Sequence, residues 1–366
     1  MRTLFKTSYD FDIRLVKHAG HALWYGLLVL FALAVPLLFD VFLIGEATSL
    51  LIWSIGGMGL MILVGQAGQE SLGHAAFLAV GCYANTILQD RMGLPFLLAL
   101  PLAGLISGFA GVLLALPTAR LHGIYLAIAT LAVSMLVEDV IILAEPVTGG
   151  VGGLVAPTIS IFGVEFDRYA APGRFYYLVL AVTILVVFAY LNLLRSPLGR
   201  AFAAVRDSEI SARAMGVDIA RAKATAFGLS TAITGLCGAL MGHFAGVFNH
   251  ESFTLITSIQ MLMMVVIGGL GTIHGAFFGA AVVVLLPQAI VFARDFIGSF
   301  TGAGSVAVPG LEAAIFGVIL VLFILFEPLG IYGRWIKTRT FFDLFPFYRK
   351  SMFRRQKSYL KTERMR

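Results

Sequence analysis

The chain is divided into long apolar runs separated by few polar residues. These runs cover residues 20–39, 41–64, 70–88, 94–116, 121–143, 174–194, 224–246, 258–273, 275–293 and 310–326. A helix needs about 20 apolar residues to cross the hydrocarbon of a bilayer. We therefore expect an all-α integral membrane protein with about ten transmembrane helices. The third, eighth and ninth runs are short or broken by glycines, so eight or nine true spans remain an alternative.

The composition excludes a water-soluble globular fold. Hydrophobic residues make up 59% of the 366 residues and charged residues 13%, whereas soluble domains are about 45–50% apolar and about 25% charged. Backbone amides in hydrocarbon must be hydrogen-bonded within their own segment, so we expect the spans to be helices. The mixed, charged N-terminus lacks the short apolar run and cleavage site of a signal peptide, and we expect the first run to be a retained span.

Basic residues gather in the N-terminal segment 1–19, in the loop 195–223 and in the tail 331–366. Because such residues are retained on the cytoplasmic side, we expect both termini and this loop in the cytoplasm. The transmembrane domain then covers 20–330, with six spans before the loop and four after it. The loop 144–173 has no positive bias and is expected outside. The net charge is +6, and in a chain expected to lie in a lipid membrane such basic clusters mark the cytoplasmic side before they suggest binding to nucleic acid.

No sequence pattern indicates covalent chemistry. Cys82 and Cys237 lie far apart in apolar runs and form neither a disulfide framework nor a metal motif. The spacing of His74, His243 and His274 suggests neither a nucleophile–base pair nor a set of metal ligands. We therefore expect no catalytic residue and no metal site.

One polar motif, GQESLGHAAF at residues 68–77, interrupts the apolar sequence. Glycines weaken a helix, and transporters place substrate sites at broken helices. We expect this motif to line a translocation path or to brace the helices that do; the candidates are Gln69, Glu70, Ser71 and His74. On a helix, Ser71 and His74 share a face and Glu70 lies beside His74. Packing between helices is the alternative for Ser71 and His74, and hydration at the cytoplasmic interface is the alternative for Glu70.

A second glycine-rich run, IGGLGTIHG at residues 267–275, has the same texture and adds Gly268, Gly269 and His274 to the candidates for the path. Paired broken segments in the two halves of a transporter suggest an internal repeat, although chance similarity remains open. A third run, TGGVGG at residues 148–153, lacks the GK[ST] ending of a phosphate-binding loop. We expect a re-entrant or gating loop there, with an unstructured linker as the alternative.

The basic loop 195–223 mixes small, charged and apolar residues. Residues 201–206 favour a helix, and Asp207 or Ser208 is positioned to cap a second helix from Glu209 to Met215, which Gly216 then ends. Short helices of this kind suit docking into a groove on another protein. A connector lying on the membrane surface is the alternative.

Five stretches of this chain resemble, in order, segments of known permeases. The LivM-like branch of the branched-chain amino acid ABC permeases is resembled by GQESLGHAAFLAVGCY, LPTARLHGIYLAIATLAVSM, TGGVGGL, RDSEISARAMGVD and MVVIGGLGTIHGAFFGA. Within the fourth stretch, Glu209, Ala212, Ala214 and Gly216 resemble the EAA-type coupling loop of ABC-importer permeases. The resemblance covers roughly 52–330. Glu70 departs from it, because we expect an apolar residue there. Coupling to an ATPase is then expected to involve Arg206, Asp207, Ser208, Glu209, Ala212, Ala214 and Gly216.

The resemblance implies a membrane subunit of an ATP-driven importer in the bacterial inner membrane, with branched-chain or other apolar amino acids as substrates. It implies no cofactor on this chain, with ATP and Mg on two ABC ATPase subunits. It also implies a second related permease subunit and a periplasmic substrate-binding protein. Urea, short amides and aromatic acids are alternative substrates within the family. An ion-coupled secondary transporter is the alternative of another class, and it usually carries acidic residues inside its spans.

Overall fold

The computed structural model describes a helical bundle within defined limits of the chain. The described residues are 19–301 apart from 119, 120 and 122, then 314, 317, 318, 321, 322 and 325, and finally 330–344. Three expectations lie wholly or largely outside these residues. They are the N-terminal segment 1–19, the tenth apolar run at 310–326 and the tail 331–366 beyond 344.

The long helices between residues 19 and 301 follow the apolar runs of the sequence, and one further helix lies in the basic tail. They are α2 (Ala19–Leu38), α3 (Val41–Leu60), α4 (His74–Asp90), α5 (Phe96–Thr118), α6 (Ile124–Leu143), α8 (Pro172–Arg195), α11 (Ile219–Ala245), α12 (Leu255–Gly268), α13 (Ile273–Thr301) and α15 (Gly330–Leu344). Within the described ranges, seven helical segments are long and apolar enough to cross a membrane, from Val41–Gln66 to Ile273–Phe292. A shorter apolar helix covers Ala22–Leu38. Helices of this length and apolarity are typical of a multi-pass membrane protein.

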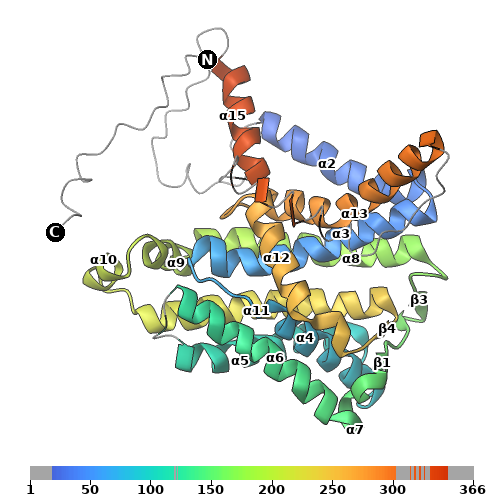
Figure 1. Ribbon diagram of the computed structural model, residues 1–366, viewed down its shortest axis with the longest axis horizontal. Helices are drawn as coiled ribbons and strands as arrows, with labels where there is room; N and C mark the ends of the chain where they lie inside the picture. Colours follow the sequence, from blue (N-terminus) through green and yellow to red (C-terminus); the bar gives the residue numbers. More distant parts are fainter. Residues whose placement is uncertain are drawn as a thin grey trace.

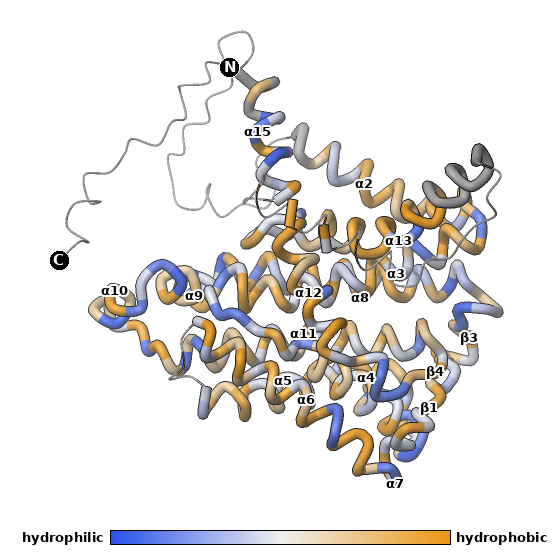
Figure 2. The backbone as a smooth tube through the Cα atoms, in the orientation of Figure 1, coloured by the Kyte–Doolittle hydropathy of each residue, from blue (hydrophilic) through white to orange (hydrophobic). Residues whose placement is uncertain are grey.

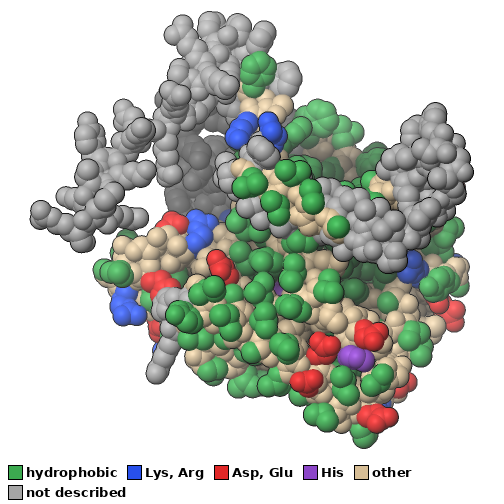
Figure 3. Space-filling model, viewed as in Figure 1, with side chains coloured by type: hydrophobic (Ala, Val, Ile, Leu, Met, Phe, Trp, Pro, Cys, Tyr) green, Lys and Arg blue, Asp and Glu red, His purple; other side chains and the backbone are tan. Residues whose placement is uncertain are grey.

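Small elements gather at the two ends of the bundle. Helices α9 (Pro197–Asp207) and α10 (Glu209–Ala214) lie together at one end, and strands β1 (Leu154–Val155), β3 (Val164–Phe166) and β4 (Val247–Phe248) lie at the other (Figure 1). Both ends carry hydrophilic segments, whereas the helices between them are largely hydrophobic (Figure 2). Apolar side chains also cover much of the surface between the ends (Figure 3). This distribution is the one that a bilayer requires of a spanning bundle.

Helix α11 runs through the centre of the bundle and packs against α4 with almost no side chain between the two backbones. A Cβ atom on Gly81 would collide with the backbone of Gly235, and one on Gly238 would collide with the backbone of Leu78. The Ser107 hydroxyl of α5 donates a hydrogen bond to Phe77 O (3.0 Å) or to Thr231 O (2.9 Å). Small residues and interhelical hydrogen bonds are how helices associate where no water drives them together.

The loop 144–173 is ordered, so the unstructured linker is wrong for this segment. It contains α7 (Glu145–Thr148), the short helix η2 (Gly150–Gly152), and strands β1, β2 (Ile159–Ile161) and β3. Strand β1 pairs antiparallel with β4, and β2 pairs antiparallel with β3. Arg168 fixes the loop to α11, since its guanidinium donates to Phe244 O (2.9 Å) and lies 3.8 Å from the centre of the Phe244 ring.

Candidate functional site

The polar motif coincides with a break between two helices. After α3 the chain forms a π-helical turn, η1 (Met61–Gln66), and residues 67–73 are not helical before α4 begins at His74. Backbone hydrogen bonds from Ala67 N to Ile62 O (3.1 Å) and from Gln69 N to Leu63 O (3.0 Å) close the end of the turn. Gly68 has a φ of 66°, which glycine adopts without strain. Single π-helical turns of this kind are frequent at functional sites.

His74 holds the start of α4 to α11 and to α3 through buried hydrogen bonds. Its Nδ1 lies 2.8 Å from Ser71 Oγ, and its Nε2 lies 2.9 Å from Ser230 Oγ. The Ser230 hydroxyl donates to Gly59 O (2.7 Å), so it accepts from a protonated His74 Nε2, and Nδ1 accepts from Ser71. All three side chains are buried. Ser71 and His74 therefore brace helices, which is one of the two roles expected of this motif.

Glu70 and Gln69 lie differently from their neighbours in the motif. The expected helical pairing of Glu70 with His74 is wrong, because α4 begins only at His74 and Glu70 is an exposed residue of the non-helical segment before it. Gln69 is only 6% exposed, and its Nε2 has no hydrogen-bond partner. The break therefore presents an exposed carboxylate and a buried, unsatisfied amide side by side.

The second glycine-rich run also breaks a helix, and it meets the first break. Helix α12 ends at Gly268, and α13 begins at Ile273. Gln66 Nε2 donates to Gly271 O (3.0 Å) and also lies 3.3 Å from the Tyr190 hydroxyl. A Cβ atom on Gly65 would lie 2.7 Å from Gly271 N, so the two backbones touch. The two breaks form one junction between the halves of the bundle.

The remaining candidates of the second run lie apart from this junction or serve packing. His274 is exposed; its Nε2 lies 3.0 Å from the Tyr25 hydroxyl of α2, and its ring stacks on Tyr332 of α15 at 5.1 Å. Gly268 is buried where a Cβ atom would collide with Gly275 O, and Gly269 has a φ of 119°. The structure therefore does not bring His274 together with His74.

The loop 195–223 contains two short helices, with caps close to those expected. Ser208 separates α9 from α10, and its hydroxyl accepts a hydrogen bond from Ser211 N (3.3 Å). Helix α10 ends at Ala214, one residue before the expected Met215, and Gly216 follows with a φ of 86°. Ala212 is buried, whereas Ala214 and Gly216 are exposed.

Arg206 joins α9 to the first break. Its Nη1 donates to Gly65 O (3.0 Å), and its Nη2 forms an ion pair with Asp207 (3.1 Å). A Cβ atom on Gly68 would lie 2.8 Å from Cγ of Arg206, so the arginine stem lies directly against the break. The end of α9 and the helix break are thus in contact.

A second link was not identified from the sequence. Lys223 Nζ lies 2.8 Å from Glu209 Oε1. From the sequence alone, Lys223 is only one of the basic residues of the loop 195–223. The Lys223 side chain is 5% exposed and that of Glu209 32%. An ammonium this deeply buried requires a partner, and Glu209 supplies it. The sequence did offer one indication of this burial: Asp218 caps α11, which makes Lys223 the fifth residue of that helix rather than part of a loop.

The site is a junction of two helix breaks and two short helices. Within the described ranges, no cluster of three or more His, Cys, Asp or Glu side chains could hold a metal ion. What the geometry offers is mechanical contact between α9, α10 and two broken helices. Together with the apolar bundle, this defines a multi-pass membrane protein of the permease class.

The comparisons with known proteins give the family. The chain belongs to the family described as "Branched-chain amino acid transport system / permease component", which matches residues 42–325. Permease proteins named LivM from Salmonella typhimurium and Escherichia coli, of high-affinity branched-chain amino acid transport systems, are each 34% identical over 325 residues. That region covers 83% of this chain and 73% of each relative.

More distant relatives include both kinds of permease subunit. A probable branched-chain amino acid transport permease protein LivM from Methanocaldococcus jannaschii is 27% identical over 84% of this chain and 91% of its own length. A protein named LivH from the same organism is 24% identical over 75% of this chain and 87% of its own length. No solved structure matches the chain. These names confirm the LivM-like resemblance drawn from the sequence motifs.

Proposed function

We propose that the chain is the permease subunit of an ATP-driven importer for branched-chain or other apolar amino acids in the bacterial inner membrane. The observation that carries this proposal is the contact of Arg206 with Gly65, which joins the loop 195–223 to the break in the first half of the bundle. Two ABC ATPase subunits bind this loop, and their closure moves α9 and α10. The movement reaches the junction of the two breaks and changes which side of the membrane it faces.

The exposed side of α10 supports docking of a partner protein. Ile210 and Met215 are 85% and 83% exposed at the end of the bundle, beyond the apolar band. Exposed apolar side chains on a polar surface are typical of protein interfaces. In this proposal the loop lies in the cytoplasm and the ATPase subunits carry ATP and Mg.

The opposite end of the bundle supports contact with a substrate-binding protein. Acidic side chains gather there, over the region of α7 and β1 (Figure 3). In the proposal this end faces the periplasm, where the binding protein delivers its solute. A second, related permease subunit completes the path, as the LivM and LivH relatives suggest.

The sequence candidate of the ion-coupled alternative, Glu70, lies outside the candidate spans, whereas Glu46 of α3 and Glu138 of α6 lie inside them and are only partly buried. Glu70 is exposed, and among the described residues the buried charged side chains include Lys223 but no Asp or Glu. A secondary transporter usually carries acidic residues inside its spans.

The test is reconstitution of the whole importer in proteoliposomes, with both permeases, the ATPase subunits and the binding protein. We expect uptake of leucine only with ATP and the binding protein, and no uptake on a proton or sodium gradient alone. Ile210→Asp is expected to lower co-purification of the ATPase subunits. Ser160→Asp adds the same charge at an exposed position of β2, outside the loop 195–223, and is expected to leave co-purification unchanged. Gradient-driven uptake without ATP would remove the proposal.

A further inference from the structure

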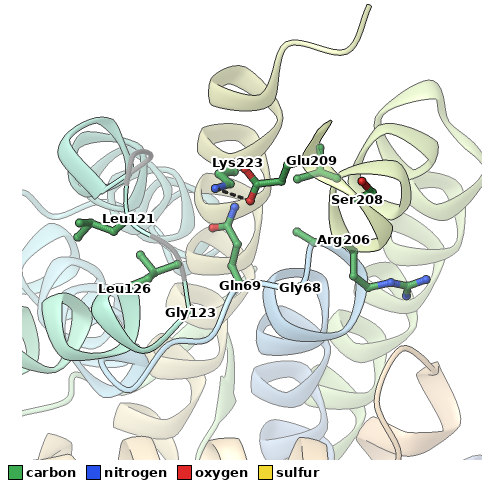
Figure 4. Close-up of a pocket in the computed structure, with 11 residues that line it drawn as sticks. Gly68, Gln69, Leu121, Gly123, Leu126, Arg206, Ser208, Glu209 and Lys223 are labelled. Atoms are coloured by element: carbon green, nitrogen blue, oxygen red, sulfur yellow. Dashed lines mark ion pairs between the residues drawn. The ribbon is translucent and has the colours of Figure 1, made fainter. Parts of the chain in front are cut away.

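A polar cavity lies between the first break and the start of α10. It has a volume of about 160 Å³ and lies between α10, the start of α11 and the non-helical segment before α4 (Figure 4). Gln69, Glu209 and Lys223 line it on one side, and Leu121 and Leu126 line it on another. Gly68 is exposed at its edge and Glu209 is partly exposed, so the cavity is in contact with solvent.

Two polar groups of this cavity, the Gln69 amide and the Lys223 ammonium, leave donor capacity unused. The Gln69 side chain points toward the ion pair between Lys223 and Glu209 (Figure 4). Gln69 is 6% exposed and its Nε2 has no partner, and a buried amide without a partner is uncommon because its lost hydration is not replaced. An ammonium group carries three donors, so Lys223 retains donors beyond the one directed at Glu209. The cavity therefore offers amide and ammonium donors beside one carboxylate.

This arrangement matches the two charges of an α-amino acid. A carboxylate accepts from Lys223 Nζ and Gln69 Nε2, while an ammonium donates to the Glu209 carboxylate, and an apolar side chain contacts Leu121 and Leu126. The volume is well below the roughly 300–1,000 Å³ of pockets for drug-sized ligands, which favours a solute of this size over a nucleotide.

We propose that this cavity binds a free α-amino acid from the cytoplasm and thereby lets the accumulated product slow the importer. A solute bridging Gln69 of the break and Glu209 of α10 opposes the relative movement of these two segments. The inference rests on the proposed function, because that function supplies both the cytoplasmic orientation and the amino acid. It adds a second binding site, separate from the translocation path between the breaks.

The test uses the complete importer in proteoliposomes whose ATPase subunits face outward, with the binding protein and leucine inside. Leucine is then added outside, and ATP hydrolysis is measured. We expect leucine to inhibit at a concentration at least about tenfold below that of 4-methylpentanoate, which lacks the ammonium, or isoamylamine, which lacks the carboxylate; one lost ionic contact of about 1.4 kcal/mol gives this factor. Equal potency of the three compounds, equal inhibition by inorganic phosphate, or no inhibition overturns the inference.

A variant locates the effect. Gln69→Leu keeps the size of the side chain and removes the amide, and we expect the half-inhibitory leucine concentration, relative to the uninhibited rate of the same variant, to rise about tenfold. Asn192→Leu removes an amide from an exposed position of α8 outside the cavity and is expected to leave that concentration unchanged. An unchanged value in an assembled Gln69→Leu complex contradicts the site. If this variant does not assemble, the inference is tested by comparing leucine with its two analogues on the wild-type importer.

The outcome also separates this inference from the proposed function. ATP-dependent uptake of leucine together with unaltered ATP hydrolysis at high external leucine removes the cavity site and leaves the proposed function intact. Absence of ATP-dependent uptake for every amino acid removes both.

Discussion

The guanidinium of Arg206 donates a hydrogen bond of 3.0 Å to the carbonyl oxygen of Gly65. Arg206 belongs to the last turn of α9, and Gly65 belongs to the π-helical turn that precedes the first helix break. Gly65 in turn lies against Gly271 of the second break. One contact therefore connects the loop 195–223 to the place where both broken segments meet.

The first prediction concerns the sidedness of the chain. Ser211 of α10 and Ser160 of β2 are both exposed. Strand β2 pairs with β3, and β3 and α10 lie at opposite ends of the bundle (Figure 1). We expect a membrane-impermeant maleimide to label Ser211→Cys only from the cytoplasmic side and Ser160→Cys only from the periplasmic side. The native Cys82 and Cys237 are buried and serve as an unlabelled background. Labelling of both variants from one side would contradict the topology.

The second prediction concerns His74. His74→Phe removes the contacts with Ser71 and Ser230, and leaving a buried partner unsatisfied costs about 1–3 kcal/mol. We expect a lower melting temperature of the complex with an unchanged number of solutes transported per ATP. The control is His274→Phe, which changes an exposed ring and is expected to alter stability less. Normal stability with altered transport in His74→Phe would instead place His74 in the path.

The third prediction concerns the contact of α4 with α11. Gly81→Ala places a methyl group against the backbone of Gly235, and overpacking of this kind costs about 1–3 kcal/mol. Gly26→Ala, in α2, places its methyl group where no atom lies within 4 Å. We expect the first variant to lower the melting temperature and the second to leave it unchanged or raise it. Equal behaviour of the two would show that α4 and α11 are not in backbone contact.

The fourth prediction concerns the pair of Lys223 with Glu209. Lys223→Met removes the ion-pair partner that Lys223 provides to Glu209. We expect the free energy of unfolding to fall by less than the roughly 3–5 kcal/mol of a fully buried pair, because the Glu209 side chain is 32% exposed. A double-mutant cycle with Glu209→Gln measures their coupling by denaturation of the complex. The exposed pair of Arg221 with Asp218 is the matched control and should show about 0–1 kcal/mol. A coupling no larger than that of the control would contradict the buried pair.

Features that depend on local sequence could be predicted. The apolar run at 174–194 corresponds to helix α8, Pro172–Arg195. Ser208, one of the two cap candidates, and Gly216 as the residue that ends the helix could be identified because capping depends on neighbouring residues. Helix α11 begins at Ile219 rather than 224, since Asp218 caps a polar first turn that a hydrophobicity pattern does not include.

Contacts made by the fold could not be predicted from spacing. Gln66 and Gly271 are 205 residues apart in the chain, and Lys223 meets Glu209 only because α10 folds back onto α11. The expected pairing of Glu70 with His74 assumed a continuous helix, whereas the break separates them. Both glycine runs were identified as sites of interest, but their meeting at Gly65 required the structure.

The central claim is tested most directly by counting leucine molecules transported per ATP hydrolysed in proteoliposomes that contain the complete importer with Arg206→Gln. A hydrogen bond to a charged group contributes about 1.5–3 kcal/mol, so we expect ATP hydrolysis to continue while the ratio falls about tenfold. Arg221→Gln removes the same charge from an 88% exposed position in the same loop and should keep the wild-type ratio. A wild-type ratio in Arg206→Gln would contradict the claim that α9 moves the break through Gly65.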